Sequence, residues 1–516
     1  MIGLVKRIFK NVLAFSRSNP LEFWTLVIIL AVGAFCRLYK ISGYMTFLGD
    51  EGRDVIIVRR LLVEGHPPLI GPGTSIGNMY LGPLYYYMMA PALLFANFSP
   101  VGPAVMIALL GIITIWFVWY TGRIWFGNVA SLVAAGIYAI SPTVITYSRS
   151  SWNPNIMPFF ALLCIYSIWK VWRDSNYSWL VVLGVSFAFV LQSHYLGLLL
   201  APTLIIFYVL GYLKAKSPRE SSKAFKFSVY GMVAFLALMS PLFFFDLRHN
   251  WINSRAMYTF FTVRQTTVSI RPWTAIPSFY PQFSVIMSRL VGGQNVVAGE
   301  VASILAIASL LYVIVVNWRK IGKINPAYFL LFSWIGFGIL GLALYKQNIY
   351  DHYYGFIFAV PYFLIGIAVS ILGRYKMIGK VAGLIAVAYL VFVNVMNSPL
   401  RYAPNNQLQR AFDVAKKIEE ESGGNRFNLG VIAERNYEDG YKYFLLKDKA
   451  SVVDIDSQVK GSITNQLFAV CELSPTSKCD PTHNSSAAVA NFGWSKIDSS
   501  WEVDGVIVYK LVHTKS

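Results

Sequence analysis

Long apolar stretches separated by short polar segments dominate the first 400 residues of the chain. Each stretch approaches the roughly 20 apolar residues that a helix needs to cross the hydrocarbon core of a bilayer. We expect about eleven such spans, centred on residues 23–39, 101–120, 129–147, 156–172, 179–194, 196–213, 227–245, 300–317, 327–344, 353–372 and 380–396. The pattern therefore predicts an all-α polytopic membrane protein over this part of the chain.

Two further apolar stretches are predicted to lie along the membrane surface. Tyr80 to Phe98 is rich in tyrosine and is interrupted by Pro83 and Pro91. Counting it as a span would move several basic clusters to the wrong side of the membrane. Val55 to Gly65 combines apolar and basic residues in a short amphipathic segment. Both stretches suit helices that lie in the interface plane.

Basic clusters test this topology. They lie at the N-terminus, at Arg123, at Lys170 and Arg173, at Lys214 to Lys226, at Arg319 to Lys323 and at Arg374 to Lys380. Alternation of the eleven spans puts all of them on one side, which the positive-inside rule identifies as the cytoplasm. We expect a cytoplasmic N-terminus with a retained first helix, and a plasma (inner) membrane location, because no cleavage site or organellar address is found.

After Asn397 the chain changes character. Gln407 to Ser422 shows helical spacing of apolar residues, while Phe427 to Ala433 and Val506 to Val512 have the pattern of strands. We predict a transmembrane domain at 1–397 and a small soluble, extracytoplasmic α/β domain at 398–516. Two of its residues, Cys471 and Cys479, are plausible disulfide partners in an oxidising compartment.

Composition agrees with a membrane protein and narrows its partners. Mean hydropathy is +0.52, hydrophobic residues make up 56% and charged residues 13%. The net charge of +19 is concentrated before residue 401, because the segment 401–516 holds 14 basic and 15 acidic residues. This excess favours membrane lipids or a phosphorylated lipid as partners, not nucleic acid. No CxxC, HExxH or P-loop pattern is found.

Acidic residues gather in one place. Residues 23–400 hold nine of them, and four fall in the stretch that follows the first span. The four are Asp50, Glu51, Asp54 and Glu64. Membrane chains place charge sparingly, so such a cluster is a candidate functional site. The alternative is a solvated loop in which Asp54 caps a helix that begins near Val55.

Three other predicted outer loops carry polar groups. Tyr147 to Asn155, Asp246 to Asn250 and Tyr345 to Tyr353 all combine cations or histidines with aromatic residues. A long loop of about fifty residues is expected to follow Asp246. Cations on an outer surface oppose the topology rule, and a bound phosphate would explain them because arginine offers forked donors. Alternatively, these side chains extend to lipid headgroups.

Together these features resemble the GT-C class of membrane glycosyltransferases. The likeness covers roughly Phe23 to Leu372 and rests on the position of the Asp50-Glu51 pair, on the run Gly111 to Ser148, on the basic and aromatic second outer loop, and on the Asp351-His352-Tyr353 segment. Within the class, the chain is most similar to family 39 relatives, which include protein O-mannosyltransferases and the lipid A aminoarabinose transferase. The C-terminal domain resembles no catalytic domain.

The resemblance implies a sugar donor linked to polyprenyl phosphate and transfer to a lipid, glycan or protein acceptor on the outer face. Asp50 matches the catalytic aspartate of the first outer loop, and its neighbour Glu51 is the second residue predicted to be catalytic. The second outer loop has Arg149, Asn153 and Asn155 but no carboxylate, which puts a metal site built from two outer loops in doubt. A divalent ion is left open as a cofactor.

These roles are chemically consistent. Inverting sugar transfer needs a base for the acceptor hydroxyl, which we assign to Asp50. Cations stabilise the leaving phosphate. Glu51 either binds a divalent ion or orients an arginine. The residues predicted to contact substrate are Arg53, Tyr85, Arg149, Asn153, Asn155, Arg248, His249, Lys346, Asp351 and His352.

A transporter or flippase of polyprenyl lipids is the alternative function. Such a protein would carry polar groups within its spans, near the middle of the bilayer. The predicted spans are nearly free of ionisable residues, and the charge lies at the surface. The sequence therefore favours the enzyme.

Overall fold

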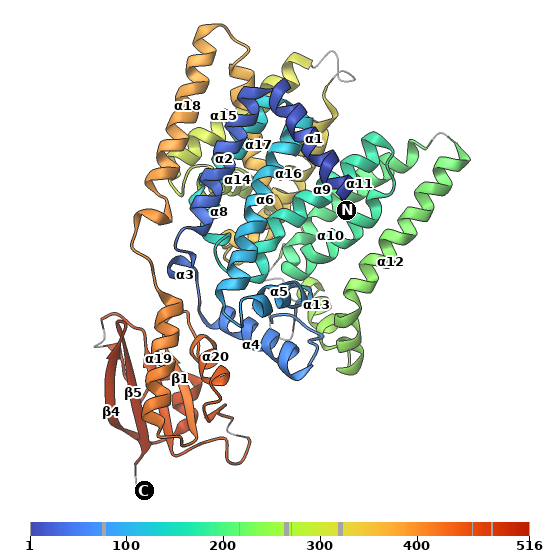
Figure 1. Ribbon diagram of the computed structural model, residues 1–516. Helices are drawn as coiled ribbons and strands as arrows, with labels where there is room; N and C mark the ends of the chain where they lie inside the picture. Colours follow the sequence, from blue (N-terminus) through green and yellow to red (C-terminus); the bar gives the residue numbers. More distant parts are fainter. Residues whose placement is uncertain are drawn as a thin grey trace.

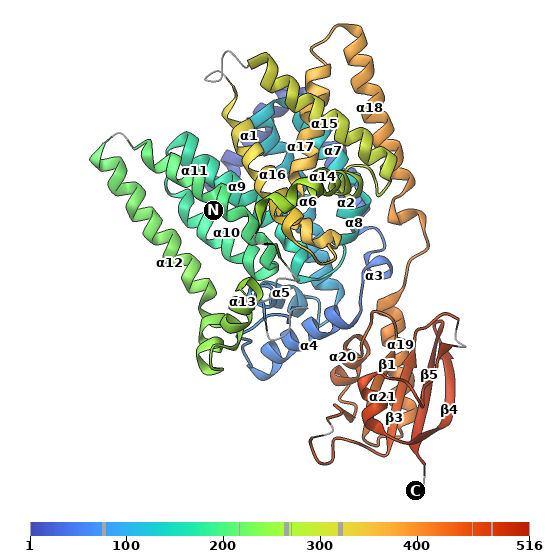
Figure 2. The same cartoon turned by 180° about the vertical axis from the view of Figure 1, so that it is seen from behind.

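The computed structural model describes residues 2–74, 79–215, 217–262, 268–269, 271–317, 324–456, 458–475 and 478–514. The predicted cytoplasmic cluster Arg319 to Lys323 lies outside the described residues. Figure 1 shows a bundle of helices from which α18 (Met377–Met396) leads to a small sheet domain, and Figure 2 shows the same arrangement from behind.

The elements of the bundle follow the apolar pattern. In chain order they are α1 (Ile2–Ser18), α2 (Pro20–Leu38), α3 (Ile41–Tyr44), α4 (Gly49–Glu64), α5 (Leu84–Phe95), α6 (Val101–Phe126), α7 (Asn128–Ile140), α8 (Pro142–Tyr147), η1 (Asn153–Ile156), α9 (Met157–Asp174), α10 (Trp179–Ser193), η2 (Tyr195–Leu200), α11 (Ala201–Leu213), α12 (Pro218–Arg248), α13 (Ile252–Thr262), η3 (Pro272–Ala275), α14 (Ile276–Leu290), α15 (Val296–Asn317), α16 (Pro326–Leu344), η5 (Asp351–Ile357), α17 (Ala359–Leu372) and α18.

Eight helical segments in the described part of the chain are long and apolar enough to cross a membrane. The pair η5 and α17, bent by 63°, makes a ninth if it is one span. The two other predicted spans contain shorter helices, α7 with 13 residues and α10 with 15. The predicted span at 129–147 divides because Pro142 has no amide hydrogen to continue the helix of α7. The chain is an integral, multi-pass membrane protein.

The two predicted surface helices are present at the end of the bundle that faces the sheet domain (Figure 1). Pro83 precedes α5, as expected, but Pro91 does not break it. The helix continues through Pro91 because Tyr85, Met89 and Leu93 hold its buried face. The loop predicted after Asp246 was also wrong in part, since it contains α13 and α14.

The C-terminal domain is the predicted α/β unit. Its elements are α19 (Gln407–Ser422), β1 (Phe427–Ile432), α20 (Asp439–Lys447), β2 (Val452–Val453), β3 (Gln466–Cys471), α21 (Ala487–Phe492), β4 (Ser495–Val503) and β5 (Val506–His513). The sheet order is β2-β1-β3-β5-β4. β2, β1 and β3 are parallel, and β5 and β4 continue the sheet antiparallel.

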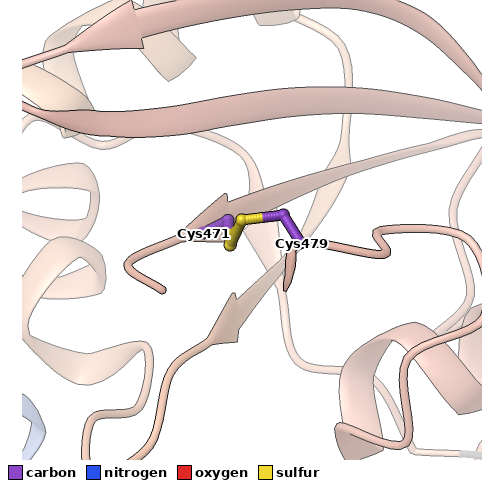
Figure 3. Close-up of a disulfide and its surroundings, with 2 residues drawn as sticks. All are labelled: Cys471 and Cys479. Atoms are coloured by element: carbon purple, nitrogen blue, oxygen red, sulfur yellow. A yellow bond between two sulfur atoms is a disulfide. The ribbon is translucent and has the colours of Figure 1, made fainter. Parts of the chain in front are cut away.

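Helices cover both faces of this sheet. Phe468 packs in one apolar cluster with residues of α19 and α20, while Leu467 packs with residues of α21 on the other face. This explains why β1 and β3 are buried along their whole length. Cys471 at the end of β3 is bonded to Cys479, which confirms the predicted disulfide (Figure 3).

Candidate active site

Three residues of the acidic cluster, Asp50, Glu51 and Asp54, lie in the first turns of a helix and not in a loop, and Glu64 is the last residue of that helix. α4 begins at Gly49, so the alternative in which Asp54 caps a helix starting near Val55 was wrong. The helix starts earlier because Glu51 accepts a hydrogen bond from the amide of Leu48 at 3.0 Å, which satisfies a donor that the helix leaves unpaired. Asp50 and Glu51 also lie in the first turn of α4, where their negative charges interact favourably with the positive end of the helix dipole.

The C-terminal domain supplies a further cap for α4. The side-chain oxygen of Asn436 accepts hydrogen bonds from the amides of Gly49 and Tyr437, both at 2.9 Å. Leu48, at the N-cap position, has no side-chain acceptor of its own. The start of α4 is therefore held by a residue from the other end of the sequence.

Arg53 is the centre of a polar network. Its Nη1 donates to Oδ1 of Asp50 at 2.7 Å, and its Nε and Nη2 donate to Oδ1 of Asp54 at 3.1 and 2.8 Å. The hydroxyl of Tyr86 also donates to Asp54, at 3.2 Å. The hydroxyl of Tyr437 donates to Oδ1 of Asp50 at 2.6 Å and accepts from Nη1 of Arg53 at 3.2 Å.

The two aspartates of this network differ in environment. Asp54 is fully buried, and burial raises its pKa to about 6 against the opposing charge of Arg53. The side chain of Asp50 is 40% exposed. Asp54 therefore orients Arg53, and Asp50 is the carboxylate that a substrate can reach.

A cavity of about 310 Å³ opens beside Asp50 and Arg53. The other residues that line it are Pro72, Gly73, Thr74, Leu81, Trp152, Asn153, Pro154, His194, Tyr195, Tyr345, Tyr350, His352 and Tyr353. Together with Asp50 and Arg53, these residues come from five separate parts of the chain, so the fold brings the predicted outer loops together at one place. Predicted residues Asp50, Arg53, Asn153 and His352 meet here.

Aromatic rings form one wall of this cavity. The ring of His352 lies 4.5 Å from that of Trp152 between centroids, and the ring of His194 lies 4.4 Å from that of Tyr353. Asn153 donates to the carbonyl of Ser193 at 2.8 Å, which ties two segments of the wall together. Flat rings with polar edges suit contact with a sugar, whose faces are apolar and whose edges are hydroxylated.

Glu51 does not line this cavity. It is buried, and its carboxylate faces the Leu48 amide instead of Arg53. The expectation that Glu51 orients an arginine was wrong, because Asp54 has that position. Among the residues that the structure describes, no group of three or more His, Cys, Asp or Glu side chains could hold a metal ion.

Glu51→Gln is expected to raise the melting temperature of the protein by several degrees at pH 7.5 and to flatten its pH dependence. Burial raises the pKa of Glu51 from 4.5 to about 7, so the folded state binds this proton more tightly than the unfolded state. Its contribution to stability therefore grows as the pH falls from about 7 to about 4.5, and is lost as the pH rises. Thermal melts in detergent from pH 5 to 8 test this, and parallel curves for the two proteins would contradict it.

Three predicted residues are structural and lie away from the cavity. Arg149 is buried and donates to the carbonyls of Cys36 and Tyr39 at 3.1 and 2.6 Å, so it caps the end of α2 instead of facing a phosphate. Tyr85 is buried against Ser151, with 2.7 Å between their hydroxyl oxygens. Asn155 donates to the backbone carbonyl of Ser150 at 2.8 Å.

Four other predicted residues also lie outside the cavity walls. Arg248 and His249 are exposed at the end of α12, where the Nδ1 of His249 lies 2.8 Å from the carbonyl oxygen of Phe245. Lys346 is exposed in the segment between Tyr345 and Tyr350. Asp351 pairs with Arg289 at 3.3 Å. None of these four residues is among those that line the cavity beside Asp50.

Sequence reasoning missed His194, Tyr195, Tyr345, Tyr350 and Tyr437. A signal for the first two was available, because Gln192 to Tyr195 interrupts two apolar runs with four polar residues. Tyr437 gave no such signal, since nothing in its local sequence indicates contact with Asp50.

Comparisons with known proteins agree with this architecture. A family model described as dolichyl-phosphate-mannose-protein mannosyltransferase matches residues 81–245. Asp50 and Arg53 precede the matched residues, so their assignment rests on the geometry of α4. No curated protein sequence matches the chain.

Solved structures match over most of the chain. ArnT from Cupriavidus metallidurans, bound to undecaprenyl phosphate, has a TM-score of 0.57 and 13% identity, covering 94% of this chain and 97% of that one. The oligosaccharyltransferase AglB from Archaeoglobus fulgidus, in complex with an inhibitory peptide and a dolichol-phosphate, has a TM-score of 0.52 and 13% identity, covering 88% and 70%. A complex of that enzyme with zinc and sulfate has a TM-score of 0.54 and 12% identity, covering 86% and 67%. These matches confirm the predicted resemblance to the GT-C class.

Proposed function

We propose that the chain is a membrane glycosyltransferase that moves a sugar from a polyprenyl-phosphate donor to an acceptor hydroxyl, with Asp50 as base. The observation that carries the proposal is the carboxylate of Asp50, which lines a cavity walled by aromatic and histidine side chains at the end of an apolar helical bundle. The family match, and the lipid phosphates bound in the ArnT and AglB structures, support the donor class.

The reaction is a single displacement. Asp50 takes the proton of the acceptor hydroxyl as its oxygen bonds to the anomeric carbon. The bond between that carbon and the donor phosphate breaks, and polyprenyl phosphate leaves with the electron pair and one more negative charge. Because attack and departure are on opposite sides of the carbon, the product is inverted. Arg53 lines the same cavity, and its positive charge stabilises the negative charge that develops on the leaving phosphate.

We place this reaction on the outer face of a plasma membrane. The positive-inside rule puts the N-terminus in the cytoplasm and the end of the bundle with Asp50 outside, together with the C-terminal domain. The acceptor is a lipid, glycan or protein that is present there.

The experiment uses purified protein in liposomes with radiolabelled donors. Undecaprenyl and dolichyl phosphates carrying mannose or aminoarabinose are tested with extracted host membranes as acceptors. We expect the label of one donor to appear in a new product, with the anomeric configuration inverted. Movement of intact labelled lipid between the leaflets without any product would contradict the enzyme and favour the flippase.

A further inference from the structure

The C-terminal domain is packed against α4 at the position of Asp50. A Cβ atom on Gly52 would lie 2.3 Å from the backbone nitrogen of Gly440, and one on Gly49 would lie 2.5 Å from the ring of Tyr437. Neither contact is possible with a larger residue, so the two glycines beside Asp50 create the space in which the C-terminal domain sits. An apolar cluster shared by α4, α5 and α20 extends the same contact.

Within this interface, one oxygen of Asp50 is held and the other is free. Oδ1 accepts hydrogen bonds from Tyr437 at 2.6 Å and from Arg53 at 2.7 Å. In the described part of the chain, Oδ2 has no hydrogen-bond partner. An acceptor hydroxyl that enters the cavity therefore meets a carboxylate with a fixed orientation and one unused oxygen.

We propose that Tyr437 is a positioning residue for Asp50, so that sugar transfer requires the docked C-terminal domain. The inference rests on the proposed function and assigns a role to the C-terminal domain, which lies outside the residues that the family model matches. Tyr437 itself acts through Asp50 and is not among the residues that define the cavity.

The surroundings of Tyr437 suit this task. Its own amide is fixed by Asn436, whose side-chain nitrogen donates to Glu472 at 2.6 Å. Glu472 follows the disulfide-bonded Cys471 at the end of β3. Burial raises the pKa of Tyr437 far above its usual value, so its hydroxyl keeps its proton and remains a donor at every working pH.

Removal of this donor would change the pH dependence of transfer. Besides Tyr437, the ionisable groups around Asp50 are Glu51, Arg53 and Asp54 on its own helix, Tyr86 on α5, Asp439 on α20, and His194, Tyr195, Tyr345, Tyr350, His352 and Tyr353 on the cavity walls. A hydrogen bond donated to a carboxylate stabilises its charged form. Without it the base takes up a proton more readily, and the acidic limb of the pH–rate profile moves to higher pH.

The test compares Tyr437→Phe with Tyr443→Phe in the full-length protein in liposomes. Tyr443 donates its hydroxyl to the carbonyl of Phe98 across the same interface, without contact to Asp50. For Tyr437→Phe we expect kcat to fall about tenfold or more, the size of effect expected for one hydrogen bond to a charged group, with an unchanged donor KM and a shifted acidic limb. Tyr443→Phe should match the wild type in kcat and pH profile.

Thermal melts and size-exclusion profiles establish that both variants are folded. An unaltered kcat and pH profile in Tyr437→Phe would overturn the inference. The proposed function would still stand in that case, because the wild-type protein transfers sugar. An equal defect in Tyr443→Phe would also overturn it, because general loosening of the interface would then be the cause. Absence of transfer by the wild-type chain with every donor would instead overturn the proposed function, and the inference with it.

Discussion

Replacing Asp50 by asparagine is expected to abolish sugar transfer while donor binding persists. Asparagine has the same shape, and its carbonyl oxygen can still accept the hydrogen bonds of Arg53 and Tyr437. It cannot take up the proton of the acceptor hydroxyl at neutral pH. Loss of a general base lowers the rate by about 100- to 10,000-fold, so single-turnover transfer from a bound labelled donor should become undetectable or nearly so.

Glu51→Gln is the matched control for this experiment. The two residues are neighbours, both changes convert a carboxylate to an amide, and the sequence proposes both as catalytic. Because the Glu51 side chain is buried against Leu48, its variant should retain most of the transfer rate. Full activity in Asp50→Asn, or equal losses in the two variants, would contradict the assignment of Asp50 as the base.

Much of the fold could be predicted because a bilayer imposes a simple rule on sequence. Apolar length alone located most of the spans, and the few polar residues around Gln192 to Tyr195 mark where one run ends. The start of α4 was less predictable. Leu48 is an unusual N-cap residue, and the cap from Asn436 depends on a contact across the whole chain.

The site was predictable only in part. Charge is rare near a membrane, so the acidic cluster correctly indicated Asp50 and Arg53 as cavity residues. The same reasoning was wrong for Arg149, because an arginine at a membrane surface can be satisfied by the carbonyls at the end of a helix as well as by a phosphate. Tyr437 depends on how two domains dock, and local sequence patterns carry no information about that.

The second large effect is expected on stability. Arg53→Met should destabilise the protein by about 3 kcal/mol or more, because Asp54 is fully buried and would lose the cation that compensates its charge. Burial already raises the pKa of Asp54 to about 6, and loss of Arg53 would raise that pKa further. The folded protein would then accommodate Asp54 only in its protonated form. The loss of folding stability should therefore be larger at pH 8 than at pH 5.5.

Arg53→Met combined with Asp54→Asn separates stability from function. The double variant has no buried charge to compensate, so its melting temperature should return most of the way to the wild-type value at pH 8. Transfer should stay low, since Asp50 would still lack the Arg53 hydrogen bond and the cavity would lack its cation. Thermal melts and transfer assays on the two variants and on Asp54→Asn alone measure how strongly the effects of the two substitutions depend on each other. Equal instability of Arg53→Met at both pH values, without rescue by Asp54→Asn, would show that Arg53 stabilises the fold by packing and not through the charge of Asp54.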